Sequence, residues 1–452
     1  MQRLLSIITV LLLGASFARA EILSSNIIDL DQCFLMAVRR SETLQMKEED
    51  INQAAAKFSQ ALGAVLPQLA FKGTELLQDV PSSDQAANNS TSISSTFLRR
   101  SIPNTSINLT QPIFSGLKEF RTMAGLKASQ KRLRHEHQRA AQLLYRDVAQ
   151  SFYTVLQVQT DIAILVRQES VLRKRIAELR DRAKVGRSRE SEIAATEAQE
   201  ANVAAALSEI RGTLLVAREM LEFLTGVSIN QKIQDSKPAS NKQSIDYFLE
   251  SSESRDDVLA ASIAVQEAQN NLKVSGAGYS PTISLSANYY PYRVGFYEPI
   301  KWDATFYLTL PIFQGNIRGQ IQEAKSKLVA SELNEQLTRR QSEQDIRSAY
   351  STWKSTLSQM NSYNRAAQKN RINYEAQTAD YQTNLVSNLE VLQAFADWLN
   401  AERRANQLRF QAKVNYAQLL VASGKIPGTG ISSAVLNVER EASPELKLKD
   451  RP

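Results

Sequence analysis

One segment of this chain occurs twice, and the repeat constrains the fold more than any other feature of the sequence. Residues 109–116 read LTQPIFSG and residues 308–315 read LTLPIFQG, so six of the eight positions are identical. Each copy is followed by a helical stretch of about one hundred residues that ends at a glycine, Gly226 or Gly424. Agreement at both ends of so long a stretch indicates an internal duplication.

The two halves are expected to share one order of elements. In each half a helix leads to a proline, Pro67 or Pro281, then to two strands and the shared motif, and then to two long helices. The motif marks the passage from strand to helix at Pro112, Phe114 and Gly116 in the first half and at Pro311, Phe313 and Gly315 in the second. We therefore expect a first repeat at 21–227, a linker at 228–249, a second repeat at 250–425 and a polar tail at 426–452.

Apolar and polar residues alternate between the prolines of the second half. Trp302, Phe306 and Leu308 fall on one face of an extended chain, and Asp303 and Thr305 fall on the other. The expected strands span about 281–291 and 301–311 in this half and about 67–78 and 101–112 in the first, lengths that suit tilted membrane strands. A sheet packed on a soluble core is the alternative, because alternation alone does not exclude it.

The stretches after the motif have the residue spacing of coiled coils. Ile346, Tyr350 and Trp353 advance by four and three residues, and Val148 and Phe152 match the first two of them in the other half. The expected long helices span 116–185, 188–225, 315–383 and 387–423. The first of them would be about 105 Å long at 1.5 Å per residue, and no compact globular domain needs such a rod.

The N-terminus has the pattern of an exported protein. Arg3 precedes an apolar run at 4–13, and Ala18 and Ala20 form a small-residue cleavage site. We expect residues 1–20 to be a cleaved signal peptide, because the run is too short to span a membrane as a helix. No later stretch has the length and apolarity of a membrane helix, so a membrane would have to be crossed by strands.

Cys33 is the only cysteine, and it lies well past the expected cleavage site. It follows Asp31 and Gln32, where a lipidation site would need small residues, so we expect a chain that is not lipidated. We expect Cys33 to be a small buried side chain on the first helix. A single cysteine also excludes an intrachain disulfide.

These patterns predict a mainly α fold with a β-barrel part. Four strands in one chain cannot close a barrel, and lipid does not tolerate an open sheet edge. Oligomerisation is therefore required, and a trimer would complete a transmembrane barrel of twelve strands.

The paired PIFxG motifs, the LPQL segment at 66–69 and the long duplicated helices resemble those of the TolC family of outer-membrane efflux proteins. The resemblance covers nearly the whole chain after the signal peptide. It implies a homotrimer with a barrel in outer-membrane lipid and a long periplasmic α-barrel of antiparallel coiled-coil helices. It also implies a passive exit duct of a tripartite efflux or type I secretion system, for small molecules or proteins delivered by an inner-membrane transporter and a periplasmic adaptor.

Members of this family carry acidic residues around their periplasmic entrance, in a motif that the sequence EVLQ partly matches. The resemblance assigns entrance selectivity to Glu390, with Gln393 in place of a second acidic residue. The repeat places Glu192 opposite Glu390 and Gly186 opposite Asn384, so a trimer could carry six carboxylates near its mouth. Such a ring would favour cations, because a narrow mouth of low dielectric concentrates the field of its charges. A solvated glutamate at a helix end is the alternative.

Basic residues crowd the tip of the first long helix pair. Arg182, Lys184, Arg187 and Arg189 could contact an acidic surface of the adaptor, and a solvated basic turn is the alternative. The matching turn of the second half, residues 384–387, lacks the basic residue that the family often has there.

No pattern of catalytic or metal-binding residues is present. His135 and His137 are the only histidines and lie two apart on an expected helix, where side chains diverge, so we expect both to be exposed. Nothing matches a nucleophile elbow, a phosphate-binding loop or zinc spacing, so neither enzyme activity nor a cofactor or metal is expected. Acidic residues interleave with the basic ones, as at 169–182, so nucleic acid is not an expected partner. The rival class is a soluble periplasmic coiled-coil scaffold or adaptor, which would not require the two strand pairs.

Overall fold

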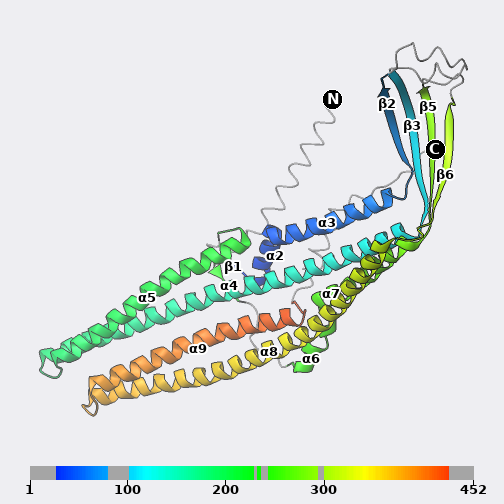
Figure 1. Cartoon of the computed structure of the whole chain (residues 1–452). Helices are drawn as coiled ribbons and strands as arrows, with labels where there is room; N and C mark the ends of the chain where they lie inside the picture. The colour runs from blue at the N-terminus through cyan, green and yellow to red at the C-terminus, as the bar shows by residue number, and fades with distance from the viewer. Residues whose placement is uncertain (1–26, 80–100, 229–231, 236–242, 294–299, 427–452) are drawn as a thin grey trace, which may run out of the picture. The chain divides into compact units, whose positions relative to one another are not determined.

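The computed structural model describes residues 27–79, 101–228, 232–235, 243–293 and 300–426. The expected signal peptide lies outside the described residues, and so does the expected tail except for residue 426. The helices are α2 (Leu30–Arg40), α3 (Glu42–Gly63), α4 (Lys118–Lys184), α5 (Glu190–Thr225), α6 (Ile245–Leu249), α7 (Asp256–Gly276), α8 (Gly315–Gln382) and α9 (Asn388–Ala422) (Figure 1). The longer strands are β2 (Gln68–Leu77), β3 (Ser101–Ser115), β5 (Thr282–Arg293) and β6 (Trp302–Thr309). The prediction of a mainly helical chain with four such strands is confirmed.

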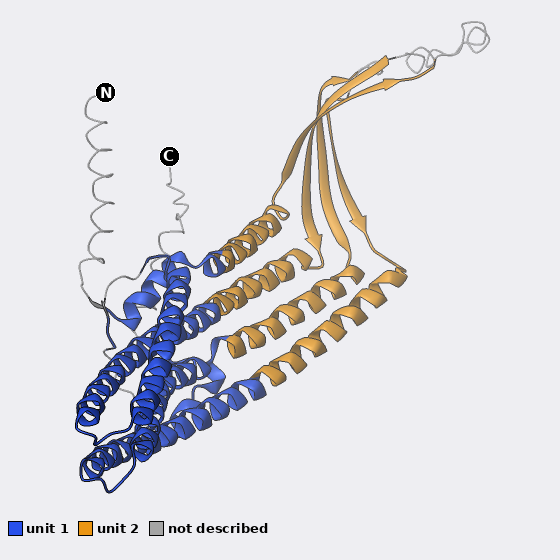
Figure 2. Ribbon diagram, turned by 90° about the vertical axis from the view of Figure 1, so that its left-hand side faces the viewer, with its two compact units in different colours: residues 1–45, 138–256, 339–452 blue, residues 46–137, 257–338 orange. Residues whose placement is uncertain are grey.

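The described chain forms two compact units, which do not follow the two sequence repeats (Figure 2). Unit 1 comprises residues 1–45, 138–256 and 339–452, and unit 2 comprises residues 46–137 and 257–338. Each unit therefore takes segments from both halves of the chain. The helices α4 and α8 begin in unit 2 and end in unit 1.

The sheet of unit 2 is antiparallel in the order β2-β3-β5-β6. Its register aligns Phe71, Ile107, Tyr289 and Trp302 in one row across the four strands. Side chains that lie directly opposite each other point to the same face of a sheet. The apolar residues that alternate along each strand therefore combine into one continuous apolar face.

The opposite face of this sheet carries a row of polar side chains. Asn108, Asn288 and Asp303 lie opposite one another on β3, β5 and β6. Asn108 Nδ2 donates to Asn288 Oδ1 at 2.8 Å, and Asn288 Nδ2 donates to Asp303 Oδ1 at 2.8 Å. The two faces differ in polarity as the alternation in the sequence predicts.

The two copies of the shared motif adopt different conformations. The strand expected to end at residue 112 continues to Ser115, because a register shift between Pro112 and Phe114 accommodates the proline. In the second copy β6 ends at Thr309, two residues before the expected end, and the side chain of Phe313 is 89% exposed. Only Gly116 among the motif glycines has a left-handed backbone, with φ of 67°.

Unit 1 contains the hydrophobic cores of the described helices. The coiled-coil positions predicted from the spacing are buried: Val148 and Phe152 in one cluster and Ile346 and Trp353 in another. Cys33 lies fully buried on α2, as expected, and burial, together with nearby Asp29, raises the pKa of its thiol to about 12.

The described parts of the linker belong to unit 1 and pack against its helices. Strand β4 (Lys232–Ile233) pairs in parallel with β1 (Ile27–Ile28), and Asp235 forms a buried ion pair with Lys413 of α9. Phe248 of α6 is buried against Trp353 and its neighbours. None of the helices in the described ranges has the length and apolarity that a bilayer-crossing helix needs.

Candidate functional site

The turn between α4 and α5 and the turn between α8 and α9 have the same backbone. Gly186 and Asn384 both lie in the left-handed region, with φ of 67° and 60°. In both turns the residue after this position donates its amide to the carbonyl five residues earlier, from Arg187 to Arg182 and from Leu385 to Asp380, each at 2.9 Å. Asparagine tolerates this conformation better than other residues with a Cβ. The two turns can therefore have the same backbone geometry although their sequences differ.

Glu192 and Glu390 each lie at the third position of the helix that follows the turn. Glu192 Oε2 accepts hydrogen bonds from the Ser188 hydroxyl at 2.8 Å and from the Arg189 amide at 3.3 Å. Glu390 Oε2 accepts from the Ser387 amide at 2.7 Å and from the Ser387 hydroxyl at 2.9 Å. Both carboxylates therefore cap the first turn of their helix, which gives each a structural role of its own.

The surroundings of these two glutamates keep them ionised. Partial burial acts to raise the pKa of Glu192, but hydrogen bonds from Tyr381, Ser188 and Arg189 outweigh it and lower that pKa below its ordinary value. The backbone and side-chain hydrogen bonds of Ser387 lower the pKa of Glu390, which is fully exposed. At neutral pH both side chains carry negative charge.

Tyr381 of α8 joins the two repeats at this tip. Its hydroxyl donates to Glu192 Oε2 at 2.8 Å, and its ring is buried. The guanidinium carbons of Arg175 and Arg182 lie 4.1 Å and 5.1 Å from the ring centroid. Burial, and then the bond to Glu192, raise the pKa of the Tyr381 hydroxyl, so it stays protonated and remains a donor.

Asn388, the first residue of α9, is buried and makes a second contact between the two repeats at this tip. Its Nδ2 donates to Thr196 Oγ1 at 3.1 Å and to the Glu192 carbonyl at 3.2 Å, and its Oδ1 accepts from Arg175 Nη2 at 3.2 Å. One buried apolar residue from each of the four helices packs alongside, as Leu179, Ile193, Tyr381 and Val391. We name the set Arg175, Glu192, Thr196, Tyr381 and Asn388 the tip network.

Most residues of the tip network could not be identified from the sequence. Glu192 was identified through the repeat, but Arg175, Tyr381 and Asn388 gave no signal in one sequence because their partners lie about 190 to 210 residues away. Residues 384–387 carry no positive charge, and the guanidinium in contact with Tyr381 and Asn388 is that of Arg175 on α4. The other expected entrance residue, Gln393, is exposed and donates to Asp397 Oδ1 at 3.1 Å, outside the network.

The four expected basic residues divide into two pairs. Arg182 is partly buried on Tyr381 and lies 3.8 Å from Glu178, and Lys184 forms an ion pair with Asp181 at 2.8 Å. Arg187 and Arg189 are exposed at the turn. Of the four, these two form no ion pair with any described residue, so they are the better candidates for a contact with another protein.

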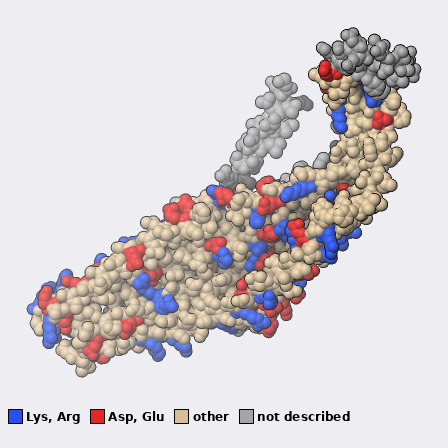
Figure 3. Space-filling view, in the orientation of Figure 1, with Lys and Arg blue, Asp and Glu red and all other residues tan. Residues whose placement is uncertain are grey.

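Charges elsewhere on the helices are mixed in sign. On the face shown in Figure 3, Lys and Arg side chains alternate with Asp and Glu along the helices. Arg173 bonds Glu200 at 3.0 Å and Arg180 bonds Glu197 at 2.5 Å, each between α4 and α5. This interspersed pattern is typical of solvated helix faces.

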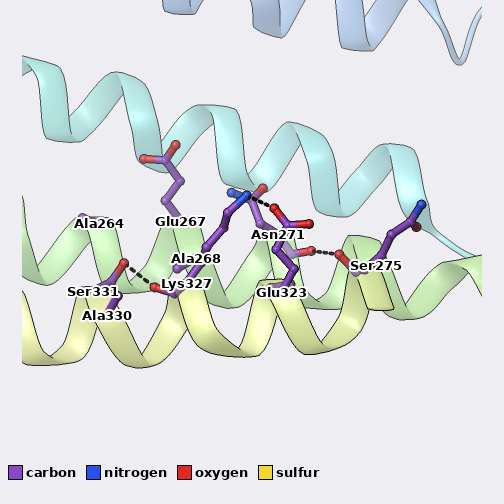
Figure 4. Close-up of a pocket in the computed structure, with 11 residues that line it drawn as sticks. Ala264, Glu267, Ala268, Asn271, Ser275, Glu323, Lys327, Ala330 and Ser331 are labelled. Atoms are coloured by element: carbon purple, nitrogen blue, oxygen red, sulfur yellow. Dashed lines mark hydrogen bonds and ion pairs between the residues drawn. The ribbon is translucent and has the colours of Figure 1, made fainter. Parts of the chain in front are cut away.

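A hollow of about 570 Å³ lies between α7 and α8 in unit 2 (Figure 4). Its ion pair, Lys327 to Glu323 at 2.5 Å, stays within α8, and its Glu267 pairs with Arg132 of α4 at 3.1 Å. The hydrogen bonds of Ser275 and Ser331 also stay within their own helices. No set of polar groups converges on the space, so it does not resemble a ligand site.

The histidine, cysteine and acidic side chains of the described ranges do not gather into a metal site. Within them, no group of three or more His, Cys, Asp or Glu side chains is placed to hold a metal ion. His135 and His137 are half-buried, whereas we expected both to be exposed. Each of them takes part in an interaction, which the spacing of two residues did not predict.

Comparison with known proteins gives consistent matches. Residues 250–425 match the family model of the outer membrane efflux proteins. The chain is 22% identical to the outer membrane protein TolC of Escherichia coli (strain K12) in an alignment of 452 positions. The alignment covers 94% of this chain and 87% of TolC.

Solved structures share the fold at low sequence identity. The CmeC outer membrane channel of Campylobacter jejuni superposes with a TM-score of 0.75 at 18% identity, covering 91% of this chain and 89% of CmeC. The outer membrane protein VceC of Vibrio cholerae gives a TM-score of 0.74 at 18% identity, covering 87% of this chain and 96% of VceC. The chain thus carries the outer membrane efflux protein match over residues 250–425, is similar to TolC over nearly its whole length, and shares the fold of these solved outer membrane channels.

Proposed function

We propose that this chain is one subunit of an outer-membrane channel, a passive exit duct for small molecules or proteins. An inner-membrane transporter and a periplasmic adaptor would deliver the cargo to it. The observation that carries the proposal is the sheet of unit 2, which has a continuous apolar face and two edge strands with one neighbour each among the described strands.

The apolar face of this sheet argues against a sheet packed on a soluble core. Leu69 and Phe71 are each 72% exposed, and Phe306 is 69% exposed. An uncovered apolar face of this size needs lipid or another chain over it. Lipid suits the face better, because Tyr289, Tyr292 and Trp302 gather toward one end of it, as in the aromatic girdles of membrane barrels.

The open edges of the sheet support a closed oligomer. Unpaired backbone groups on β2 and β6 would be costly in lipid, and pairing β6 of one copy with β2 of the next would satisfy them. Three copies would give twelve strands, the number proposed from the sequence. A helix of unit 2 also supports an oligomer. Val329, Leu333 and Leu337 are exposed on α8 at a spacing of four residues, so they form one apolar stripe that another copy could cover.

The tip supports the proposed periplasmic entrance. Glu390 is exposed and ionised, whereas Glu192 is partly covered and bonded to Tyr381, so Glu390 is the better candidate for a charged ring. Replacement Glu390→Gln keeps an acceptor for the helix cap but removes the charge. Reconstituted channels with Glu390→Gln should lose cation preference, and an unchanged reversal potential in a salt gradient would reject this role.

Export and partners follow from the same proposal. Residues 1–20 would be a cleaved signal peptide, and the complete burial of Cys33 within α2 supports a chain that is not lipidated. Arg187 and Arg189 at the tip would meet the adaptor. Neither a cofactor nor a catalytic step is part of this function.

The proposal is tested by fractionating native membranes and measuring the detergent-corrected mass of the extracted particle. Recovery in the outer membrane at three chains per particle is the expected result. Recovery as a soluble periplasmic monomer or dimer would contradict it. The chain would then be a periplasmic coiled-coil scaffold, which is the alternative function.

A further inference from the structure

A β-bulge near the end of β5 changes which of its side chains lie on the apolar face of the sheet. The pairing of β3 with β5 shifts between Thr105 and Ile107, where β5 has one extra residue. Tyr292 and Tyr289 are the partners of these two residues, so both tyrosines share the apolar face with them. Without the extra residue, two positions that are three residues apart would lie on opposite faces.

The same bulge places Arg293 on the polar face. Arg293 pairs with Asn104, which lies four residues from Asn108 on β3 and so shares the polar face with it. The guanidinium carbon of Arg293 lies over the ring of Tyr290, 4.6 Å from the ring centroid. A guanidinium over an aromatic ring is attracted to the face of that ring. Tyr290 therefore supports Arg293 on the polar face.

Tyr290 is itself held by the row of polar residues across the sheet. Its hydroxyl forms a hydrogen bond with the carboxylate of Asp303 on β6. Asn288 Nδ2 donates to the same carboxylate at 2.8 Å, and Asn108 Nδ2 donates to Asn288 Oδ1 at 2.8 Å. These hydrogen bonds converge on Asp303, so they fix its carboxylate and, through Tyr290, the place of Arg293.

The charges on the polar face favour an anion. Within the four described strands, the charged residues of this face are two cations, Lys72 and Arg293, and one anion, Asp303. The hydrogen bonds from Asn288 and Tyr290 already occupy the Asp303 carboxylate. Lys72 is exposed and lies opposite Ser106, so no aromatic ring faces it across the strand pair.

A supported guanidinium is suited to binding an oxyanion. Arginine binds carboxylates and phosphates through two parallel N–H···O hydrogen bonds from its planar fork. A side chain that is already positioned loses less conformational entropy when a ligand binds. Arg293 combines both properties, whereas Lys72 offers a point charge on a flexible stem.

We propose that Arg293 is an oxyanion-binding residue on the polar face of the sheet and that it selects cargo carrying a carboxylate or phosphate group. Tyr290 and Asp303 are positioning residues, because they act through Arg293. The inference rests on the proposed function, since the polar face lines a duct only when the sheet closes into a barrel.

Binding is tested by calorimetry of the detergent-extracted particle with citrate and, separately, with inorganic phosphate. Saturable binding is expected, and the anion that binds more tightly decides between a carboxylate and a phosphate cargo. Arg293→Gln should abolish binding. Arg293→Lys keeps the charge but loses the planar fork, so it should weaken binding about tenfold. Tyr290→Phe keeps the ring but loses the bond to Asp303, and it should weaken binding less than Arg293→Lys does.

The matched control is Lys72→Gln, which removes the same charge from the same face. It should leave anion binding unchanged, because Lys72 lacks the support that Tyr290 gives to Arg293. Equal loss of binding in Lys72→Gln and Arg293→Gln would overturn the inference, since a general positive field would then explain both. The absence of binding of either anion to the wild-type particle would also overturn it.

A second measurement tests the selection of cargo. In channels with Glu390→Gln the entrance charge is removed, so we expect the reversal potential in a salt gradient to show a preference for anions. Adding Arg293→Gln should remove this preference, and an unchanged reversal potential would reject a role in selection. Calorimetry does not depend on conduction. If the particle proved not to be a channel, it would still decide whether Arg293 binds oxyanions.

Discussion

The two units of this chain bury their large apolar side chains differently. In unit 1, Phe395 and Trp353 are completely buried among helices of the same chain. In unit 2, Leu69, Phe306 and Trp302 are about 70% exposed on a sheet with open edges. These two side chains of unit 1 are packed within the chain itself, whereas the apolar side chains on the sheet of unit 2 are not covered by any described part of the chain.

The largest expected effect is the loss of a core aromatic residue in unit 1. Phe395→Ala should destabilise this unit by about 3–5 kcal/mol, since it removes a fully buried ring. Trp302→Ala in unit 2 should change the denaturant midpoint of the detergent-extracted helices far less. Equal shifts in both variants would show that the two units unfold as one body.

A charge on the apolar face of the sheet should disturb unit 2 without affecting unit 1. Phe306→Arg should cost about 2–4 kcal/mol if the side chain meets the middle of a bilayer. Thr305→Arg lies on the opposite face and should be tolerated. Membrane insertion of the two variants is compared by urea extraction, and equal insertion would argue against lipid on the apolar face.

The two copies of the motif allow a smaller test inside unit 2. Gly116→Ala forces a Cβ into a left-handed position with a cost of about 1–2 kcal/mol, and that Cβ would lie 2.4 Å from the Ser280 Cβ. Gly315→Ala meets no atom closer than 4.0 Å and should be neutral. Unfolding midpoints of the two variants measure the difference, and a neutral Gly116→Ala would mean that the turn can rearrange.

The smallest expected effect is the acid sensitivity of the tip in unit 1. The pKa of Glu192 is lowered in the folded chain from 4.5, so its contribution is complete above this value and is lost as the pH falls through the lowered pKa. The protection of the amides at the start of α5, taken relative to their intrinsic exchange rates, should therefore decrease below pH 4.5. Glu192→Gln should weaken this dependence, and an unchanged profile would assign the acid response to other groups.

The parts of the fold that depend on local pattern could be predicted from the sequence. The duplicated motif located the four strands and four long helices, and the spacing of Ile346 and Trp353 identified a buried seam. The end of β3 was misjudged at Pro112, because the sequence does not reveal that a register shift lets a proline stay within the strand.

The parts that depend on pairing between distant segments could not be predicted in the same way. Glu192 and Glu390 were found by position, but their caps and the bond to Tyr381 appear only once the helices are assembled. Asp161 and Gln168 are buried on α4 but gave no such signal, although they lie seven residues apart. Buried polar residues at such positions look like exposed ones in a single sequence, because burial depends on the partner helix.

The mixing of both repeats in each unit determines how the chain could be divided. A cut in the linker would leave two fragments, and each would lack part of both units. Each fragment would then lack packing partners in both units, but together they would contain every described helix and strand. The linker is therefore the place where this protein could be split into two complementing fragments. If each repeat formed its own domain, each fragment would hold a whole domain and would not need the other.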